Sequence, residues 1–360
     1  ARVEADDGRF LAWAAFSPAS AIKLRIWSFT ESDRIDAAMI RARIEAAIAF
    51  RARLDIRSDA LRLIHAEADG LPGLIVDRYG DVVVAQFLSA GAERWRREII
   101  EAVMELSGAT RLFERSDSAS RKLEGLEGST GWITGDGDSS VEINEHDWRF
   151  HVDVAEGHKT GHYLDQRDNR AAFARLVRGL GCARVLNCHA YTGGFAIAAL
   201  AGGATEVVSV DSSRPALAQA EAHVALNGFD PGRAGFVAAD ANTFLREQGA
   251  AGEMFDAIVL DPPKFAATVK HAERAARAYK DLNRVAFKAL APGGMLMTYS
   301  CSGAIGTELF QKIVASAALE AGVDACVLHR LEAAPDHPMT LAFPEGEYLK
   351  GLVLVRRQCR

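Results

Sequence analysis

The residues of this chain that are best suited to chemistry stand at the ends of two apolar runs. Asp261-Pro262-Pro263-Lys264 closes one run, and Cys301 closes the next, between two serines. The prolines stiffen the backbone and lack N–H donors, so Asp261 and the neighbouring carbonyls are directed at a ligand. A buried, inert cysteine is the ordinary alternative for Cys301, but the polar neighbours and the strand end weaken it. Together the two ends indicate an enzyme that attacks a nucleobase covalently before modifying it.

The chemistry that such a thiol offers is addition to carbon 6 of a pyrimidine. Carbon 5 is not nucleophilic enough to accept a methyl group unaided, but addition of a thiolate at carbon 6 makes it enamine-like. We interpret Cys301 as the nucleophile and Asp261 as the group that hydrogen-bonds the base. Lys264 is a candidate for the positive charge that favours the thiolate. Cys188 competes as a thiol, although its place in a turn favours packing there. The other cysteines are expected to be structural: Cys182, Cys326 and Cys359.

A second set of strand ends indicates a nucleoside cofactor. Residues 185–187 predict a strand that runs into a turn with Gly193, where the backbone lets a ligand approach closely and a helix begins. The next strand ends at Asp211, in place to reach ribose hydroxyls, and Asp240 follows the third, in place to bind an adenine amino group. A helix N-cap is the alternative for Asp211 alone, but three such features in order favour the nucleoside. The predicted cofactor residues are Gln166, Asn187, Tyr191, Thr192, Gly193, Asp211, Ser212, Asp240, Ala241 and Asp261.

The kind of cofactor follows from what the turn lacks. It has no G-x-G-x-x-G pattern, which disfavours a dinucleotide. Without a glycine loop for pyrophosphate, S-adenosylmethionine is expected rather than NAD. The 5 cysteines show no C-x-x-C spacing, so neither a zinc site nor a disulfide framework is expected.

A polar segment at residues 157–170 precedes this region and runs into a predicted helix. In the simpler interpretation Asp165 caps the helix and the arginines are solvated. The functional interpretation is a lid over the cofactor whose basic residues hold nucleic-acid phosphate. The predicted RNA contacts are Lys159, Tyr163, Arg167 and Lys264.

These sites need a scaffold of alternating strands and helices, which residues 156–360 provide. Strand-like runs at 184–187, 206–210, 235–237, 255–260 and 295–299 alternate with helical stretches, including 194–201, 214–227 and 272–290. The alternation predicts βαβ units and an α/β fold with a parallel, doubly wound sheet. Runs at 325–330 and 349–356 could add the last strands. Before this region, we expect short strands and a helix in residues 1–57 and a compact α+β domain in residues 58–155.

Composition limits the class of protein. The 360 residues are 49% hydrophobic and 25% charged, as in a soluble protein of two or three domains. No apolar run approaches the roughly 20 residues of a membrane span, so we expect a cytoplasmic protein without membrane contact. The net charge of −6 argues against a uniformly basic nucleic-acid binder. Arginines between residues 41 and 62 form either a solvated helix face or a surface that tracks phosphate.

Several motifs spread over nearly the whole chain share the pattern of one family. They are residues 67–81, 159–167, 191–194, 261–265, 300–302, 336–338 and 348–351. Through them the chain resembles the large-subunit ribosomal RNA 5-methylcytosine methyltransferase family, type I. The resemblance implies a PUA RNA-binding domain, a central α+β domain and a class I (Rossmann-like) methyltransferase domain with a mostly parallel seven-stranded sheet. It also implies S-adenosylmethionine as methyl donor, ribosomal RNA as partner and Cys301 as nucleophile.

Two departures and two alternatives accompany this resemblance. Residues 1–57 are short for a complete PUA domain, and Lys264 stands where many RNA 5-methylcytosine enzymes carry a second cysteine. An N-methyltransferase acting on guanine is one alternative, although it has no use for Cys301. A catalytically silent RNA-binding protein is the other, although such a protein is expected to lose Asp211 or Asp261. The oligomeric state stays open, a homodimer included.

Overall fold

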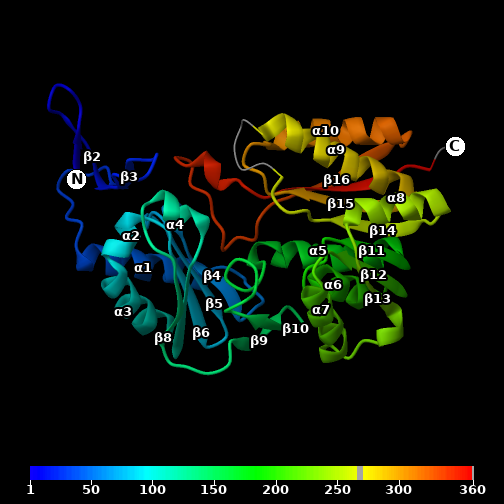
Figure 1. Ribbon diagram of the computed structural model, residues 1–360, viewed down its shortest axis with the longest axis horizontal. Helices are drawn as coiled ribbons and strands as arrows, with labels where there is room; N and C mark the ends of the chain where they lie inside the picture. The colour runs from blue at the N-terminus through cyan, green and yellow to red at the C-terminus, as the bar shows by residue number, and fades with distance from the viewer. Residues whose placement is uncertain (266–270, 359–360) are drawn as a thin grey trace. The chain divides into compact units, whose positions relative to one another are not determined.

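The computed structural model describes residues 1–265 and 271–358. The chain forms two compact units (Figure 1). The first unit comprises Ala1–Asp165 and Pro335–Gly346, and the second comprises Gln166–Ala334 and Glu347–Arg360. The first unit therefore groups the two predicted N-terminal domains with a short segment from late in the chain. Within the described residues, no helix has both the length and the apolar character needed to cross a membrane.

The first unit begins with a small antiparallel sheet and a helix. Three strands pair in the order β1-β2-β3. The helix α1 starts where the side chain of Asp36 accepts a hydrogen bond from the backbone N–H of Met39, which satisfies one of the exposed donors of the first turn. Its apolar side contributes Ile40 and Ile44 to the core of this unit. The bounds are β1 Arg2–Glu4, β2 Phe10–Phe16, β3 Leu24–Ser28 and α1 Ala37–Ala52.

A five-stranded sheet in the order β4-β5-β6-β7-β8 forms the centre of the first unit. Its pairs are antiparallel except β6 with β7, which are parallel because helices connect them. A hairpin, β9 with β10, follows. This is the mixed α+β arrangement that residues 58–155 predict. The bounds are β4 Ala60–His65, β5 Leu74–Tyr79, β6 Val82–Phe87, α2 Ala90–Arg94, α3 Arg96–Ser107, β7 Arg111–Ser116, α4 Ala119–Leu123, β8 Ser129–Thr134, β9 Ser140–Glu145 and β10 Trp148–Asp153.

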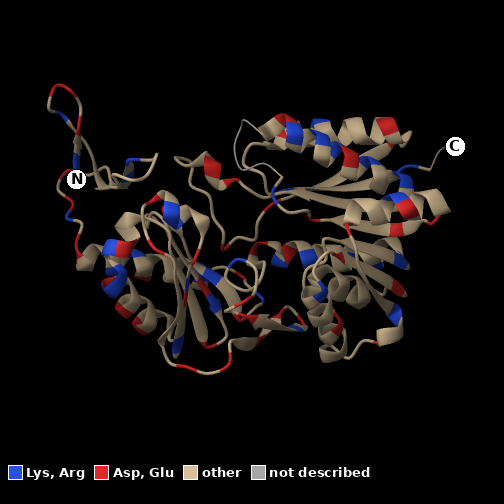
Figure 2. Cartoon of the chain, viewed as in Figure 1, with Lys and Arg blue, Asp and Glu red and all other residues tan. Residues whose placement is uncertain are grey.

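Most arginines between residues 41 and 62 serve the fold of the first unit. Their guanidinium groups bind carboxylates or backbone carbonyls, and Figure 2 shows basic and acidic residues side by side over this unit. Arg53 and Arg57 differ, because they are exposed. The phosphate-tracking interpretation therefore does not hold for the arginines that have partners within the protein. The contacts are Arg41 with Glu105, Arg43 with the carbonyls of Trp27 and Gly70, Arg51 with Asp69, and Arg62 with Asp77.

Two histidine rings of the first unit, His65 and His337, lie with their centroids 5.3 Å apart. Burial, with a smaller effect of the nearby charge of Arg62, lowers the pKa of His65 to about 2. Burial also lowers the pKa of His337. The His65 ring is therefore held neutral in the folded protein at a pH where the unfolded chain would take up a proton, and burial disfavours the charged form of His337 as well.

This pair predicts loss of stability in acid. The unfolded histidines gain protons below pH about 6.5, whereas the folded ones do not, so the unfolded state is favoured as the pH falls below that value. We expect His65 to lower the free energy of unfolding by about 1.4 kcal/mol per pH unit below that value, and His337 to act in the same direction. Urea denaturation at pH 7, 6 and 5 measures the slope. His65→Gln should make it shallower, and an equal slope in that variant would contradict the assignment.

The second unit is built on a seven-stranded sheet in the order β13-β12-β11-β14-β15-β17-β16. Its pairs are parallel from β13 to β15, and β17 lies antiparallel between β15 and β16. The bounds are α5 Arg167–Leu180, β11 Arg184–Cys188, α6 Gly194–Gly202, β12 Glu206–Asp211, α7 Arg214–Leu226, β13 Ala234–Ala238, α8 Ala241–Ala251, β14 Phe255–Leu260, α9 Ala272–Ala289, β15 Leu290–Ser300, α10 Thr307–Ala321, β16 Ala325–Leu331 and β17 Lys350–Arg356.

Helices cover both faces of this sheet: α5, α6 and α7 one face, and α8, α9 and α10 the other (Figure 1). The latter three bury their apolar sides in one core with the sheet. The parallel strands β11 to β15 all end at the same edge. Because β12 and β14 flank β11 on opposite sides, the chain reverses its direction of winding at β11, where α/β sheets bind ligands.

Candidate active site

The turn after β11 is held in an unusual backbone conformation. His189 and Tyr191 have φ angles of 57° and 47°, in the left-handed region that residues with a side chain seldom adopt. The backbone N–H of Tyr191 donates to Oδ2 of Asp211 over 2.8 Å. The end of β12 therefore braces the turn and fixes the backbone that faces the sheet edge.

Asp211 is a brace for this turn and not the cap of the following helix. Its Oδ1 accepts the backbone N–H of Ser213 over 2.9 Å, and it is Ser213 that caps α7 by accepting from Ala216. The N-cap interpretation of Asp211 is therefore wrong. Each carboxylate oxygen can accept more than one hydrogen bond, so Asp211 can also meet a hydroxyl at the sheet edge, where Ser212 beside it is exposed.

Asp240 and Ala241 begin helix α8 after the third strand. Asp240 is exposed and caps the helix, with its Oδ1 accepting the backbone N–H of Thr243 over 2.8 Å. That hydrogen bond is the main reason why the pKa of Asp240 lies below its usual value. The methyl group of Ala241 packs in the core, which leaves its backbone N–H as the group that can face a ligand.

Asn187 carries an unsatisfied donor at the end of β11. Its side chain is 1% exposed, and its Nδ2 has no hydrogen-bond partner among the described residues. A buried polar atom without a partner is costly, and a bound ligand would satisfy it. Close by, Gly193 is the N-cap residue of helix α6 and has no side chain to cap it. The first N–H groups of this helix therefore suit an anionic group.

Asp261 follows β14 and is held by a side chain of the polar segment at residues 157–170. Gln166 donates from Nε2 to Oδ2 of Asp261 over 2.9 Å. Gln166 is itself positioned by Asn169, whose Nδ2 donates to Gln166 Oε1 over 2.7 Å. Gln166 is thus brought to the same strand end as Asp261, where the sequence predicts the nucleoside site.

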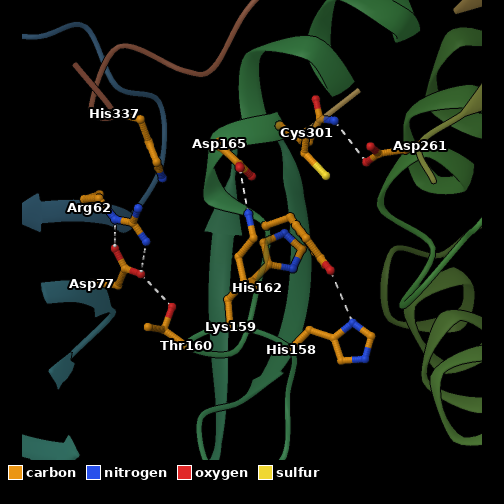
Figure 3. A network of polar contacts seen from close by, with 12 residues as sticks. Arg62, Asp77, His158, Lys159, Thr160, His162, Asp165, Asp261, Cys301 and His337 are labelled. Carbon is orange, nitrogen blue, oxygen red and sulfur yellow. Dashed lines mark hydrogen bonds and ion pairs between the residues drawn. The ribbon is translucent and has the colours of Figure 1, made fainter. Parts of the chain in front are cut away.

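Cys301 follows β15, the strand next to β14. Its Sγ lies 4.0 Å from the carbonyl oxygen of Pro262, and Figure 3 shows it beside Asp261. Cys301 is half-buried, whereas the flanking Ser300 and Ser302 are fully buried. The structure therefore brings the predicted nucleophile and the predicted base-binding carboxyl together.

The competing thiols lie in less reactive surroundings. Cys188 is fully buried, and burial raises the pKa of its thiol far above the ordinary value. Burial, aided by the charge of Asp256, raises the pKa of Cys182 to about 11. Both thiols stay protonated near neutral pH, which makes them poor nucleophiles. Cys359 lies outside the described residues.

Known proteins share much of the sequence. The profile of the S-adenosylmethionine-dependent methyltransferase family matches residues 121–352. A ribosomal RNA large subunit methyltransferase I from Aeromonas salmonicida is 49% identical over 99% of this chain and 90% of its own length. The protein of the same name from Klebsiella pneumoniae is 47% identical over 96% of this chain and 86% of its own length. The chain belongs to the ribosomal RNA large subunit methyltransferase I family.

Solved structures show the same fold. A SAM-dependent methyltransferase from Streptococcus mutans superposes with a TM-score of 0.85 at 20% identity, over 98% of this chain and 90% of that one. A methyltransferase complexed with SAH has a TM-score of 0.86 at 21% identity, with the same coverage of both chains. The prediction of a SAM-dependent methyltransferase fold is thereby confirmed.

The cofactor of this methyltransferase is S-adenosylmethionine, as the sequence predicts. It supplies an electrophilic methyl group on a sulfonium. In the second unit, the residues that the sequence predicts would hold it: Asp211 would contact the ribose, Asp240 the adenine, and the start of α6 with Asn187 the amino-acid part. The described residues contain no group of three or more His, Cys, Asp or Glu side chains that could hold a metal ion.

Replacement of Gly193 is expected to lower both stability and affinity for the cofactor. The φ of Gly193 is 80°, and a Cβ there would lie 2.7 Å from Cβ of Ala220 on α7. Gly193→Ala must therefore strain the backbone and displace the turn. We expect it to lower the free energy of unfolding by about 1–3 kcal/mol and the affinity for S-adenosylmethionine by about tenfold, or about 1.4 kcal/mol. Thermal denaturation and isothermal titration calorimetry measure the two effects.

Gly228 provides the matched control. It has a similar φ of 70°, but a Cβ there would have no heavy atom within 4 Å. Gly228→Ala should therefore cost about 1 kcal/mol of stability through backbone strain alone and leave cofactor affinity unchanged. Equal affinities in the two variants would contradict the proposed role of the turn.

Two of the predicted RNA contacts, Lys159 and Tyr163, belong to the first unit. The ammonium of Lys159 binds Oδ2 of Asp165 over 2.7 Å and lies 4.4 Å from the ring centroid of Tyr163. The hydroxyl of Tyr163 lies 3.3 Å from Nδ1 of His158. Asp165 thus binds a lysine in this structure, and the segment is ordered by its own polar contacts.

The other two predicted RNA contacts lie in the second unit and differ from each other. Lys264 is exposed, as a contact to RNA requires. Arg167 is 0% exposed and lies in the first turn of α5. A fully buried guanidinium does not fit a contact with RNA phosphate, so the predicted RNA contact of Arg167 is not supported, and neither is the simpler interpretation of a solvated arginine.

Two residues to which the sequence assigned no role complete the surroundings of Cys301, although Lys350 lies in the motif at residues 348–351. The hydroxyl of Tyr279, on α9, lies 3.0 Å from Oγ of Ser302, and Nζ of Lys350 donates to the carbonyl oxygen of Ser302 over 3.0 Å. The signal for Lys350 was present in the sequence, because a lysine directly before the apolar run of β17 is unusual. In the sequence, Tyr279 is one more position on the apolar side of an amphipathic helix, so nothing there indicates its contact with Ser302.

Proposed function

We propose that this methyltransferase modifies carbon 5 of a cytosine in large-subunit ribosomal RNA through a covalent adduct with Cys301. The observation that carries the proposal is the position of the Cys301 thiol, half-buried and 4.0 Å from the carbonyl oxygen of Pro262, beside Asp261 at the edge that holds the cofactor turn. The names of the relatives support ribosomal RNA as the substrate.

The residues of the chain divide the work as follows. The thiolate of Cys301 forms a bond from Sγ to carbon 6 of cytosine, and the electron pair of the 5,6 double bond moves toward N3. Asp261, as the carboxylic acid, donates a hydrogen bond to N3 and stabilises the added charge. Carbon 5 then takes the methyl group, and SAH leaves. Loss of the proton from carbon 5 to a base restores the double bond and expels the thiolate.

The base must leave the RNA stack for this chemistry, because carbon 5 has to face the sulfonium. We propose that Lys159, Tyr163 and Lys264 contact the RNA that presents it. We further propose that the sheet β1-β2-β3 with α1 is the part of a PUA domain contained in residues 1–57, followed by a central domain at 58–155 and the methyltransferase domain at 156–360. The enzyme would act in the cytoplasm, where ribosomal RNA is available.

Nucleoside analysis tests the proposal. Large-subunit RNA from cells lacking the gene is incubated with the protein and S-adenosylmethionine, digested, and examined by mass spectrometry. We expect 5-methylcytidine at a single position. Methylguanosine as the product would replace the proposal with guanine N-methylation, and the absence of cofactor binding by calorimetry would indicate a silent RNA-binding protein.

A further inference from the structure

Lys350 places an ammonium group in the interior of the second unit. It is the first residue of β17, where it pairs across the sheet with Ser300, and it is 4% exposed. Lysine is almost never fully buried unless it has a partner, because removing its charge from water is costly. The carbonyl of Ser302, at 3.0 Å, accepts one of its three N–H donors, which leaves capacity for a second acceptor.

The two contacts of Lys350 bracket Cys301 in the sequence. Ser300 lies opposite Lys350 in the sheet, and the carbonyl of Ser302 accepts from its Nζ. Burial lowers the pKa of Lys350, and the positive charge of Lys264 adds to the lowering. The negative charges of Glu347 and of a Cys301 thiolate act in the opposite direction. An interaction between two charges stabilises both, so the ammonium favours the thiolate as much as the thiolate favours the ammonium.

The other polar groups around Cys301 are less suited to this task. Asp261 repels a thiolate when it is ionised. Tyr279, on α9, is held as the neutral phenol, because burial, together with the nearby sulfur, raises its pKa. Lys264 carries the right charge but is exposed, so water screens it. Glu347 is exposed too and accepts from Thr307.

We propose that Lys350 is a positioning residue for Cys301, holding the thiolate with a buried ammonium and fixing the chain after β15 through the carbonyl of Ser302. This rests on the proposed function, in which Cys301 adds to the base. The thiol gives its proton to water and the thiolate pairs with the ammonium. Its electron pair then forms the bond to carbon 6, and on elimination the pair returns to sulfur beside the same ammonium.

The pH dependence of Cys301 alkylation tests the proposal without RNA. Wild type, Lys350→Met and Lys350→Arg are treated with iodoacetamide over pH 5 to 10, and the Cys301 peptide is quantified by mass spectrometry. In wild type we expect a midpoint below the ordinary value of about 8.5. In Lys350→Met we expect a higher midpoint, with the rate at pH 7 lowered about tenfold, and in Lys350→Arg a return toward wild type.

The controls separate a purely structural role from an electrostatic one. Lys312→Met, which removes an exposed ammonium of α10 that pairs with Glu308, should leave the alkylation profile unchanged. A profile in Lys350→Met that equals wild type would overturn the proposal even if methyl transfer fell, because a structural tie alone does not move the midpoint. If Lys350→Met does not fold, the wild-type midpoint decides, since a value at or above about 8.5 overturns the proposal as well.

The outcome is independent of the substrate. A low wild-type midpoint that rises in Lys350→Met, in a protein that makes no 5-methylcytidine, would uphold the pairing of Lys350 with Cys301 and refute the proposed function. Formation of 5-methylcytidine by wild type, together with an unchanged alkylation profile in Lys350→Met, would uphold the proposed function and refute the pairing of Lys350 with Cys301.

Discussion

Replacement of Cys301 by alanine is expected to lower the rate of 5-methylcytosine formation by roughly a thousandfold or more, with unchanged affinity for S-adenosylmethionine. The reason is that carbon 5 of cytosine is a weak nucleophile until a thiolate has added to carbon 6. The turn that we expect to hold the cofactor lies after β11 and is braced by Asp211 at the end of β12, whereas Cys301 follows β15. Loss of the Cys301 sulfur should therefore leave that turn intact. Single-turnover methyl transfer and isothermal titration calorimetry measure the two quantities.

Two further variants and a substrate analogue that traps the covalent adduct make this experiment specific. Cys301→Ser keeps the size of the side chain but offers a poor nucleophile, so it should be as inactive as Cys301→Ala. Cys326→Ala, on β16, removes another partly exposed thiol and should keep wild-type activity. RNA with 5-fluorocytidine has no proton to lose at carbon 5, so wild type should form a complex that survives denaturing electrophoresis, and Cys301→Ala should form none. Full activity of either Cys301 variant would refute the covalent mechanism.

Replacement of Asp77 by alanine should cause the largest loss of stability, about 3–5 kcal/mol of the free energy of unfolding of the first unit. Asp77 is 1% exposed. Its two oxygens each accept a hydrogen bond of 2.8 Å from the guanidinium of Arg62, and Oδ2 also accepts from Thr160 over 2.6 Å (Figure 3). Without the carboxylate, the buried positive charge of Arg62 loses its counterion, which is costlier than the loss of the hydrogen bonds alone.

Asp81 is the matched control, because its carboxylate also pairs with an arginine, Arg111, at 2.9 Å but is 53% exposed. Asp81→Ala should change the free energy of unfolding by less than about 1 kcal/mol. Urea denaturation followed by circular dichroism compares the two variants. If Asp77→Ala lowered the free energy of unfolding by less than about 1 kcal/mol, the expected stabilisation by the buried Arg62–Asp77 pair would be refuted.

Much of the candidate site could be predicted because its residues follow strands that the sequence marks by itself. Apolar runs bounded by turn residues gave β11 to β14 close to their observed limits, and parallel strands necessarily end at one edge. Asp211 is the last residue of β12, Asp240 follows β13 by two residues, and Asp261 and Cys301 come directly after β14 and β15. Local hydrogen bonding was harder to assign, since Ser213, two residues after Asp211, proved to be the cap of α7.

By itself, then, the sequence determined which side chains stand at the ends of the central strands and hence the type of cofactor. The tertiary structure alone decided the partners of the charged residues: the burial of Arg167, the contacts of Arg51 and Arg62 within the first unit, and the place of Lys350 beside Cys301. The physical reason is that periodicity reports whether a position is buried, which is a local property. The partner of a buried charge depends on which remote strands pair, and β17 meets β15 antiparallel only because the whole sheet packs in that order.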